Sequence, residues 1–149
     1  TYQLVLVGGN GWGGVKKRIL GFIHERYQFK DKKPIIILDF IGDEDLKSLI
    51  QNAYYVVYPS FYEGFGLPIL ESLALQTPVL VSNTSSMPEV GGNSSVYFNP
   101  YDITELKEKL VSLVANEQSY ELIRQNSMKQ VAKFTWKKTV ELLQEVITK

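Results

Sequence analysis

Short apolar runs alternate along the chain with longer segments in which apolar residues recur every three or four positions. Runs that are apolar throughout and stop at Gly, Pro or Ser are typical of strands buried on both faces. Such runs lie at residues 4–7, 35–38, 54–58, 79–81 and 96–98. The three-to-four spacing predicts helices over about 15–27, from 43, over 67–76, from 102, over 119–133 and over 135–149.

This alternation of apolar strands with helices indicates an α/β fold with a Rossmann-like parallel sheet, covered by helices on both faces. In such sheets, ligands bind beyond the carboxyl ends of the strands. The loops after Val7, Ile41, Tyr58 and Val81 are therefore the places to look for a site. The polar stretch at 82–95 is too long for a simple turn, and we expect it to be a functional loop.

The segment after the third strand carries the strongest chemical signal. It places Glu63 in a loop, Gly64 and Gly66 in a turn, Pro68 at the start of the next helix and Glu71 one turn further on. The glycines permit positive φ, and the unpaired N–H groups of the helix start suit anionic or hydroxyl-rich ligands. We expect both carboxylates at one pocket mouth, where they could accept hydrogen bonds from sugar hydroxyls. The spacing alone supports a purely structural interpretation as well as it supports a binding site. In that interpretation Glu71 complements the helix dipole and Glu63 is a solvated loop residue.

Composition narrows the function classes. The 149 residues contain sixteen Lys and Arg against sixteen Asp and Glu. This net charge of zero argues against a protein that binds nucleic acid or a membrane surface through bulk charge. The absence of cysteine excludes a disulfide scaffold, a thiolate metal site and a cysteine nucleophile. His24 is the single histidine and is expected on the surface of a helix, so no metal site is predicted.

The same region resembles a known family. Residues 58–71, Tyr-Pro-Ser-Phe-Tyr-Glu-Gly-Phe-Gly-Leu-Pro-Ile-Leu-Glu, are similar to the E-x7-E signature of retaining, family 4-type glycosyltransferases with the GT-B fold. Residues 77–90, 99–102 and 134–136 resemble the family in the same register. The resemblance runs from about Tyr2 to the C-terminus and implies a C-terminal, nucleotide-sugar-binding domain of a group 1 glycosyltransferase.

The resemblance also implies a role for each matched residue. Glu63 would be the catalytic residue that contacts the donor sugar near the reacting centre, and Glu71 would accept hydrogen bonds from the ribose of a nucleotide-sugar. The donor's sugar hydroxyls and diphosphate would be held by Gly64, Phe65, Gly66 and Leu67. Members of the family need neither a metal nor a cofactor, since the nucleotide-sugar is the substrate. Fixed donors are needed because negative charge grows on the departing nucleotide diphosphate.

Two further loops are candidates for the rim of the cleft. Residues 9–14, Gly-Asn-Gly-Trp-Gly-Gly, satisfy the G-x-G-x-x-G pattern between a strand and a helix. The acid expected about 20 residues on is out of place, since Asp39 lies 28 residues after Gly11, so a nicotinamide or flavin site is disfavoured. The family often carries a Gly-Trp element at this point. The candidate cleft residues are Gly9, Gly11, Ser85, Ser86 and Glu89.

Two departures from the family pattern affect these expectations. Gln76 stands where the family usually has a glycine, and a left-handed helix end disfavours a side chain, so the helix is expected to end differently. The family's domain begins with a strand and a helix that supply a basic pair for the diphosphate, and the sequence starts after them. We therefore expect residues 1–149 to be a partial donor domain that lacks the acceptor-binding N-terminal domain, and the isolated chain to be inactive.

The expected full-length protein is a hexosyltransferase that moves a sugar from a nucleotide-sugar to an acceptor with retention of configuration, in polysaccharide or glycolipid synthesis. The loop at 83–90 resembles bacterial mannosyltransferase-like members, which favours GDP-mannose. One alternative is a non-catalytic nucleotide-sugar-binding module, which has no need of both glutamates. Another is a glycosidase, whose two carboxylates would lie roughly 5–9.5 Å apart across an open groove, and the resemblance does not support it.

The expected partners follow from the same assignment. A saccharide or lipid-linked acceptor would bind through the missing domain, as would any contact with a membrane, and no nucleic-acid partner is expected. The expected location is the cytoplasm, where activated sugars are made, with peripheral association at the inner face of the membrane in the full-length form.

Overall fold

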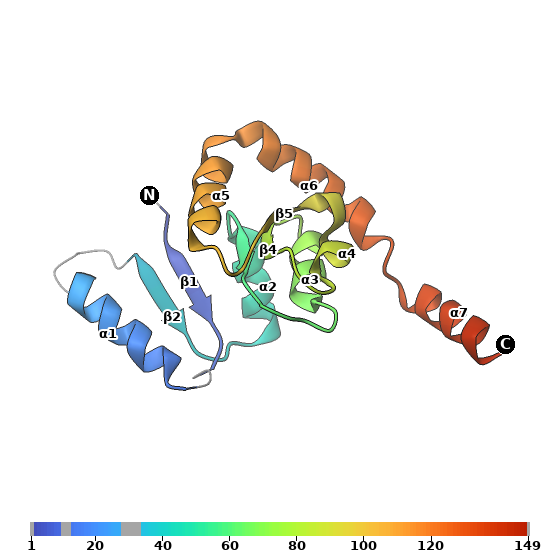
Figure 1. Cartoon of the computed structure of the whole chain (residues 1–149), viewed down its shortest axis with the longest axis horizontal. Coiled ribbons are helices and arrows are strands. Elements are labelled where there is room, and N and C mark those ends of the chain that lie inside the picture. Colours follow the sequence, from blue (N-terminus) through green and yellow to red (C-terminus); the bar gives the residue numbers. More distant parts are fainter. Residues whose placement is uncertain (1, 10–12, 28–33, 149) are drawn as a thin grey trace. The chain divides into compact units, whose positions relative to one another are not determined.

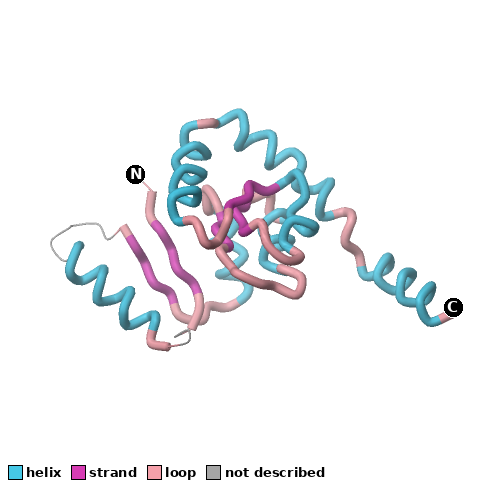
Figure 2. Tube along the Cα trace, in the orientation of Figure 1, coloured by secondary structure: helices cyan, strands magenta, loops and turns pink. Residues whose placement is uncertain are grey.

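The computed structural model describes residues 2–9, 13–27 and 34–148. The chain divides into two compact units, Thr1–Leu46 and Lys47–Lys149 (Figure 1). Figure 2 shows strands and helices alternating in each unit, as the apolar pattern predicts. The predicted element bounds agree with the observed ones to within two residues, apart from the segment at 82–95.

The first unit is built from β1 (Leu4–Val7), α1 (Val15–Tyr27) and β2 (Ile35–Leu38). The two strands pair in parallel along their whole length. A parallel pair needs a crossover connection, and α1 supplies it. The helix α2 (Asp43–Asn52) contains the division between the units. Asp43 is its first residue, and the N–H of Leu46 donates to the Gly42 carbonyl at 2.9 Å.

The second unit contains the parallel strands β3 (Val56–Tyr58), β4 (Val79–Ser82) and β5 (Ser95–Phe98), in that spatial order. Every residue of the central strand β4 is buried. Val79 and Val81 belong to one core cluster and Leu80 to another, as the two-residue repeat of a strand requires. Burying each such side chain contributes about 1.5–3 kcal/mol, so β4 anchors both clusters.

Among the described residues, the second unit also contains five α-helices that lie wholly inside it. They are α3 (Leu67–Ala74), α4 (Met87–Gly91), α5 (Ile103–Ala115), α6 (Glu117–Val131) and α7 (Trp136–Ile147). Ile69 and Leu73 of α3 join the first core cluster, and Leu113 of α5 and Ile123 of α6 join the second. The sequence predicts one parallel sheet, whereas the strands pair as two parallel sheets, β1-β2 and β3-β4-β5. Apolar periodicity identifies strands but does not say which strands become neighbours.

The stretch at 82–95 is not one long loop. Ser82 ends β4, α4 and a 3-10 turn (Gly92–Ser94) follow, and Ser95 begins β5. A five-residue helix has fewer than two turns and therefore gives no periodic signal. The irregular part shrinks to residues 83–86, which we call the serine loop.

The end of α3 corrects a second expectation. Gln76 adopts φ 57°, the left-handed conformation that a glycine would take. The N–H of Thr77 donates to the Ser72 carbonyl at 2.9 Å and that of Gln76 donates to the Leu73 carbonyl at 3.0 Å. These two bonds form a Schellman end, so the helix closes as it would with glycine. The Gln76 carbonyl also accepts a bond from Arg124 Nε at 3.2 Å.

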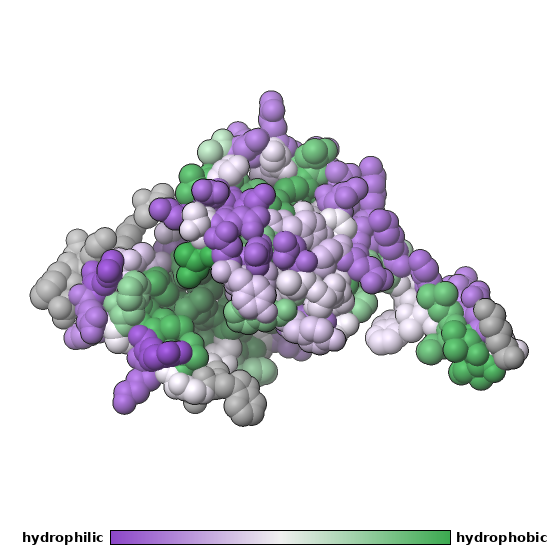
Figure 3. Space-filling model, viewed as in Figure 1, coloured by the Kyte–Doolittle hydropathy of each residue, from purple (hydrophilic) through white to green (hydrophobic). Residues whose placement is uncertain are grey.

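The later helices begin with side-chain caps. Asp102 Oδ1 accepts bonds from the N–H groups of Thr104 and Glu105, at 2.9 and 3.1 Å, as a residue at a helix N-cap does. The Glu105 carboxylate accepts a hydrogen bond from the Asn99 N–H. No residue of α7 is buried, and Figure 3 shows its apolar side chains on the surface. Among the helices of the described residues, none is both long and apolar enough to cross a bilayer.

Candidate functional site

The carboxylate of Glu63 is fixed by two hydroxyl groups. It lies in the loop at 59–66, here called the carboxylate loop, which connects β3 to α3. Tyr58 at the end of β3 donates its hydroxyl to Glu63 Oε1 at 2.8 Å, and Ser60 Oγ donates to the same oxygen at 2.7 Å. Within the described residues, no donor reaches Oε2. One carboxylate oxygen is therefore used to orient the group and the other is available to a ligand.

The Tyr58 hydroxyl stays protonated beside the charge of Glu63. The pKa of Tyr58 is raised above its usual value, and burial of the hydroxyl is the largest cause. The hydrogen bond to Glu63 and the charge of Glu63 raise the pKa as well. The hydrogen bond with Ser60 lowers it, and the charge of Glu71 raises it by the smallest amount. The hydroxyl is therefore a protonated donor throughout the neutral range.

The serine loop holds the carboxylate loop from the side. The N–H of Glu63 donates to Ser85 Oγ at 3.1 Å. Ser86 Oγ donates to the carbonyls of Glu63 and Phe65, both at 3.0 Å, and Thr84 Oγ1 donates to a third carbonyl of the carboxylate loop at 3.0 Å. Ser85 has φ 51°, so its backbone is strained in order to face Glu63. Three consecutive hydroxyls thus fix the loop that carries the carboxylate.

The start of α3 supplies a row of backbone donors. Gly66 is buried with φ 100°, and a Cβ there would lie 2.9 Å from Ile69 Cδ1. Gly64 differs from the expectation, because its φ is outside the left-handed region and open space surrounds it. The first N–H groups of a helix have no intrahelical acceptor and suit anions. Leu67 is the first residue of α3 and is exposed beside Gly66.

The other predicted residues flank these loops. Phe65 is 41% exposed, and its ring meets that of Phe134 edge-on, with the centroids 5.6 Å apart. Glu71 is exposed on α3 and Glu89 is exposed on α4. The structure therefore brings the segment at 63–67 together with Ser85 and Ser86, and places the remaining glutamates on adjacent helices.

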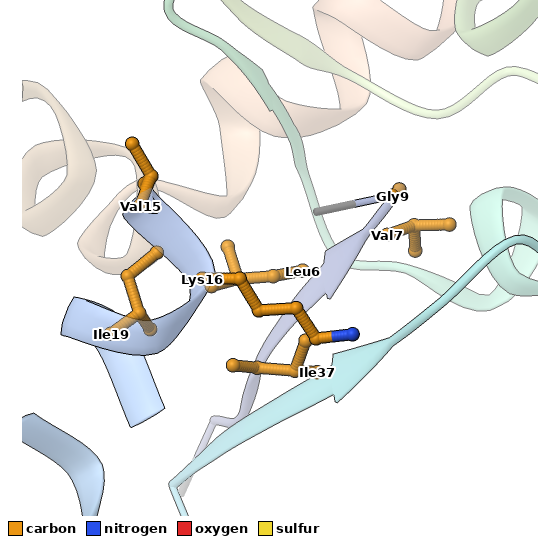
Figure 4. A pocket seen from close by; sticks show the side chains of 8 residues that line it. Leu6, Val7, Gly9, Val15, Lys16, Ile19 and Ile37 are labelled. Atoms are coloured by element: carbon orange, nitrogen blue, oxygen red, sulfur yellow. The ribbon is translucent and has the colours of Figure 1, made fainter. Parts of the chain in front are cut away.

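The glycine-rich segment belongs to the first unit. Gly9 follows β1 and lines a small cavity of about 110 Å³ with Gly8 and Lys16 (Figure 4). Lys16 lies in the first turn of α1 and forms an ion pair with Asp39, which follows β2. Gly11, the other candidate here, lies outside the described residues.

Three residues that hold Glu63 or its loop have no role assigned from the sequence: Tyr58, Ser60 and Thr84. A signal was present, because Tyr58 and Ser60 place two hydroxyls immediately before a carboxylate at a strand end. Over residues 2–9, 13–27 and 34–148, no group of three His, Asp or Glu side chains could hold a metal ion.

Comparisons with known proteins relate the chain to a family and a fold. Residues 1–130 match the family described as glycosyl transferases group 1. Among curated relatives, the O-antigen chain mannosyltransferase B of Escherichia coli is 35% identical over 135 residues, which cover 91% of this chain and 34% of that protein. The chain thus spans about a third of the length of this relative.

Solved structures show the same architecture. The C-terminal domain of LpcC, a glycosyl transferase group 1 family protein from Francisella tularensis, is 25% identical with a TM-score of 0.66, over 80% of this chain and 62% of that one. Anabaena HepE in complex with UDP-glucose is 18% identical with a TM-score of 0.78, over 98% of this chain and 40% of that one. The second likeness shows the fold alone, that of the C-terminal domain of a GT-B protein.

Proposed function

The chain belongs to the glycosyl transferases group 1 family, and we propose that it forms the donor site of an enzyme that transfers a sugar from a nucleotide-sugar with retention of configuration. The observation that carries this proposal is the fixed carboxylate of Glu63. Tyr58 and Ser60 both donate to Oε1, which leaves Oε2 available to a ligand. Such a group is oriented before the donor binds, so the reaction carries no free-energy cost for ordering the carboxylate.

Glu63 and Glu71 take different roles in this proposal. Glu63 contacts the donor sugar near the reacting carbon, where a fixed negative charge stabilises the positive charge that develops as the glycosidic bond breaks. Glu71 accepts hydrogen bonds from the two ribose hydroxyls. One short segment thus supplies a carboxylate for the sugar and a carboxylate for the ribose. This pair distinguishes a donor site from a simple nucleotide-binding loop.

The leaving group is served by the backbone at the start of α3. When the bond from sugar to phosphate breaks, the electron pair stays on the nucleotide diphosphate, whose negative charge increases. The N–H groups of Gly66 and Leu67 point from a helix start and stabilise such charge. Gly66 is the residue that permits this turn, since its φ of 100° excludes an ordinary side chain.

We infer a mannosyl donor as the first to test. The E. coli relative at 35% identity is a mannosyltransferase of O-antigen chains. The serine loop, which contacts the carboxylate loop directly, lies in the segment that resembles mannosyltransferases. The proposed donor is GDP-mannose and the proposed acceptor is a saccharide or lipid-linked saccharide in the cytoplasm, bound outside residues 1–149.

Calorimetry and turnover of the full-length protein test the proposal. GDP-mannose and UDP-sugars are titrated into the wild type, Glu71→Ala and Glu108→Ala, the last a control on the exposed face of α5. Loss of charge-assisted bonds to ribose should weaken donor binding about 10- to 100-fold in Glu71→Ala only. Glu63→Ala should bind donor and lose transfer. Absence of binding to every nucleotide-sugar refutes the proposal, and binding without transfer by the wild type favours a non-catalytic module.

A further inference from the structure

We propose that the C-terminal end of α6 positions the carboxylate of Glu63, with Gln130 and Phe134 as the positioning residues. The kinetic consequence rests on the function proposed above, whereas the structural consequence does not. Neither residue lies in the segment 58–71 that carries the site, and the motifs of the sequence assign neither a role. Figure 1 shows α6 running past α4 before the chain turns into α7, and α6 packs on α3 and on the turn at 92–94.

Gln130 is a buried amide that caps the end of α4. Its side chain is 4% exposed, and Nε2 donates to the carbonyls of Glu89 at 3.0 Å and Val90 at 2.9 Å. Oε1 accepts a bond from Lys133 Nζ at 2.7 Å, so the amide is oriented from its other end by a charge. The last carbonyls of a helix have no intrahelical donor, and here α6 provides it.

The fit between Gln130 and α4 is close. Gly92 follows α4 with φ 51°, and a Cβ on it would lie 2.4 Å from Gln130 Oε1. Gly92 must therefore lack a side chain for the amide to reach the carbonyls. On the other side, the Tyr97 hydroxyl donates to the Gly92 carbonyl at 2.6 Å, so α4 and its turn are held from both α6 and β5.

The contact between Gln130 and α4 is connected to Glu63 through the first part of α4 and through the serine loop. The helix α4 begins directly after Ser86, whose Oγ donates to the carbonyls of Glu63 and Phe65. Ser85 accepts the Glu63 N–H. Because α4 is shorter than two turns, a shift at its capped end moves its first residue as well, and the hydroxyls that fix the carboxylate loop move with it.

Phe134 makes a second, independent connection. It follows α6, and its N–H donates to the Val131 carbonyl at 3.0 Å, which holds it to the helix. Its ring packs edge-on against Phe65 of the carboxylate loop, at 5.6 Å between centroids and an interplanar angle of 85°. Edge-on aromatic pairs contribute beyond their buried area, so Phe134 restrains the backbone on the C-terminal side of Glu63.

Gln130→Met, Gln130→Glu and Phe134→Leu in the full-length protein test this role. Methionine keeps the volume of the side chain and removes both donors, whereas glutamate keeps the shape and the Lys133 partner and sets an oxygen against the two carbonyls. Lys129→Ala, an exposed change on the same turn of α6, is the control. The first readout is hydrogen exchange at the amides of 61–66 and 85–90, which requires no substrate.

The loss of one net hydrogen bond changes a local opening equilibrium about 2- to 10-fold. The Gln130 variants should therefore raise the exchange rates in those two segments about tenfold and leave the exchange rates of β4 unchanged. The second readout is kinetic, well below the unfolding temperature. We expect kcat/KM for the donor to fall about tenfold with the acceptor KM unchanged. Exchange that rises evenly through residues 47–148, or stays at the wild-type rate in all three variants, overturns the proposal. A wild type without transfer refutes the proposed function, while the exchange result still decides the positioning role.

Discussion

Replacing Gln76 with glycine should stabilise the protein. Gln76 occupies the left-handed position of a Schellman helix end, with φ 57° and an exposed side chain. The bonds that define the end use backbone atoms: the N–H groups of Gln76 and Thr77, and the Gln76 carbonyl that accepts from Arg124. A glycine retains all of them and removes the contact between Cβ and carbonyl oxygen that makes this conformation costly.

The expected gain is the difference between two terms. The left-handed conformation costs an ordinary L-residue about 1–2 kcal/mol relative to the right-handed one. Glycine loses more conformational entropy on folding, which costs about 0.5–1 kcal/mol. Gln76→Gly should therefore raise the free energy of unfolding by about 0–1.5 kcal/mol. The midpoints of the two terms give about 0.75 kcal/mol, or about 1.5–3 °C in the unfolding temperature for a domain of this size.

Urea unfolding followed by circular dichroism measures this change. Gln76→Ala is the matched control, because it removes the amide but keeps the Cβ and therefore the strain, so its stability should stay within about 0.5 kcal/mol of the wild type. Lys107→Gly, on the exposed side of α5, shows the usual loss of about 1 kcal/mol for glycine inside a helix. If Gln76→Gly is no more stable than Gln76→Ala, the assignment of strain to this position is wrong.

Three further predictions concern the site and its support. Ser85→Gly relieves φ 51° but removes the acceptor of the Glu63 N–H, so stability should change by less than about 1 kcal/mol while calorimetry shows several-fold weaker donor binding. Gly66→Ala should lower the free energy of unfolding by about 1–3 kcal/mol, whereas Gly64→Ala, in open space, should cost less than about 1 kcal/mol in the same urea assay; equal losses would contradict the geometry. Burial raises the pKa of Tyr97 to about 12, so its proton is lost from the unfolded chain near pH 10 and kept by the folded one. Stability should therefore fall from pH 10 toward about 12, and Tyr97→Phe should reduce that slope.

The sequence predicts the strands and long helices well because their apolar repeats are strong. The order of elements, the parallel pairing and the cap at Asp102 follow from residues close together in the chain. The helix α4 was missed because it is too short to repeat. Glycine conformation was only half predicted: Gly66 is left-handed and Gly64 is not.

The site shows the same division between local and distant information. The E-x7-E segment indicates where the glutamates lie, and local chemistry indicates the helix start that follows. The carboxylate of Glu63 is held by its near neighbours Tyr58 and Ser60, whereas the support of its loop comes from further away: the serine loop is more than twenty residues on and Gln130 more than sixty. Hydrogen bonds of this kind depend on how α4 and α6 pack around β4, and no spacing rule along the chain encodes that packing.

In the described part of the chain, two residues other than glycine have positive φ, Gln76 and Ser85. Their strain is of the same kind but has different surroundings. At Gln76 the strained residue contributes only backbone atoms, so glycine can replace it with a gain in stability. At Ser85 the strain places a hydroxyl against the Glu63 N–H, so the side chain cannot be removed without loosening the carboxylate loop. Strain that serves a site should persist when stability alone would remove it. Glycine variants at both positions therefore distinguish strain that serves the site from strain that does not. Gln76→Gly should gain stability with unchanged donor affinity, whereas Ser85→Gly should bind the donor more weakly. That pair of results identifies the Ser85 backbone as part of the donor site.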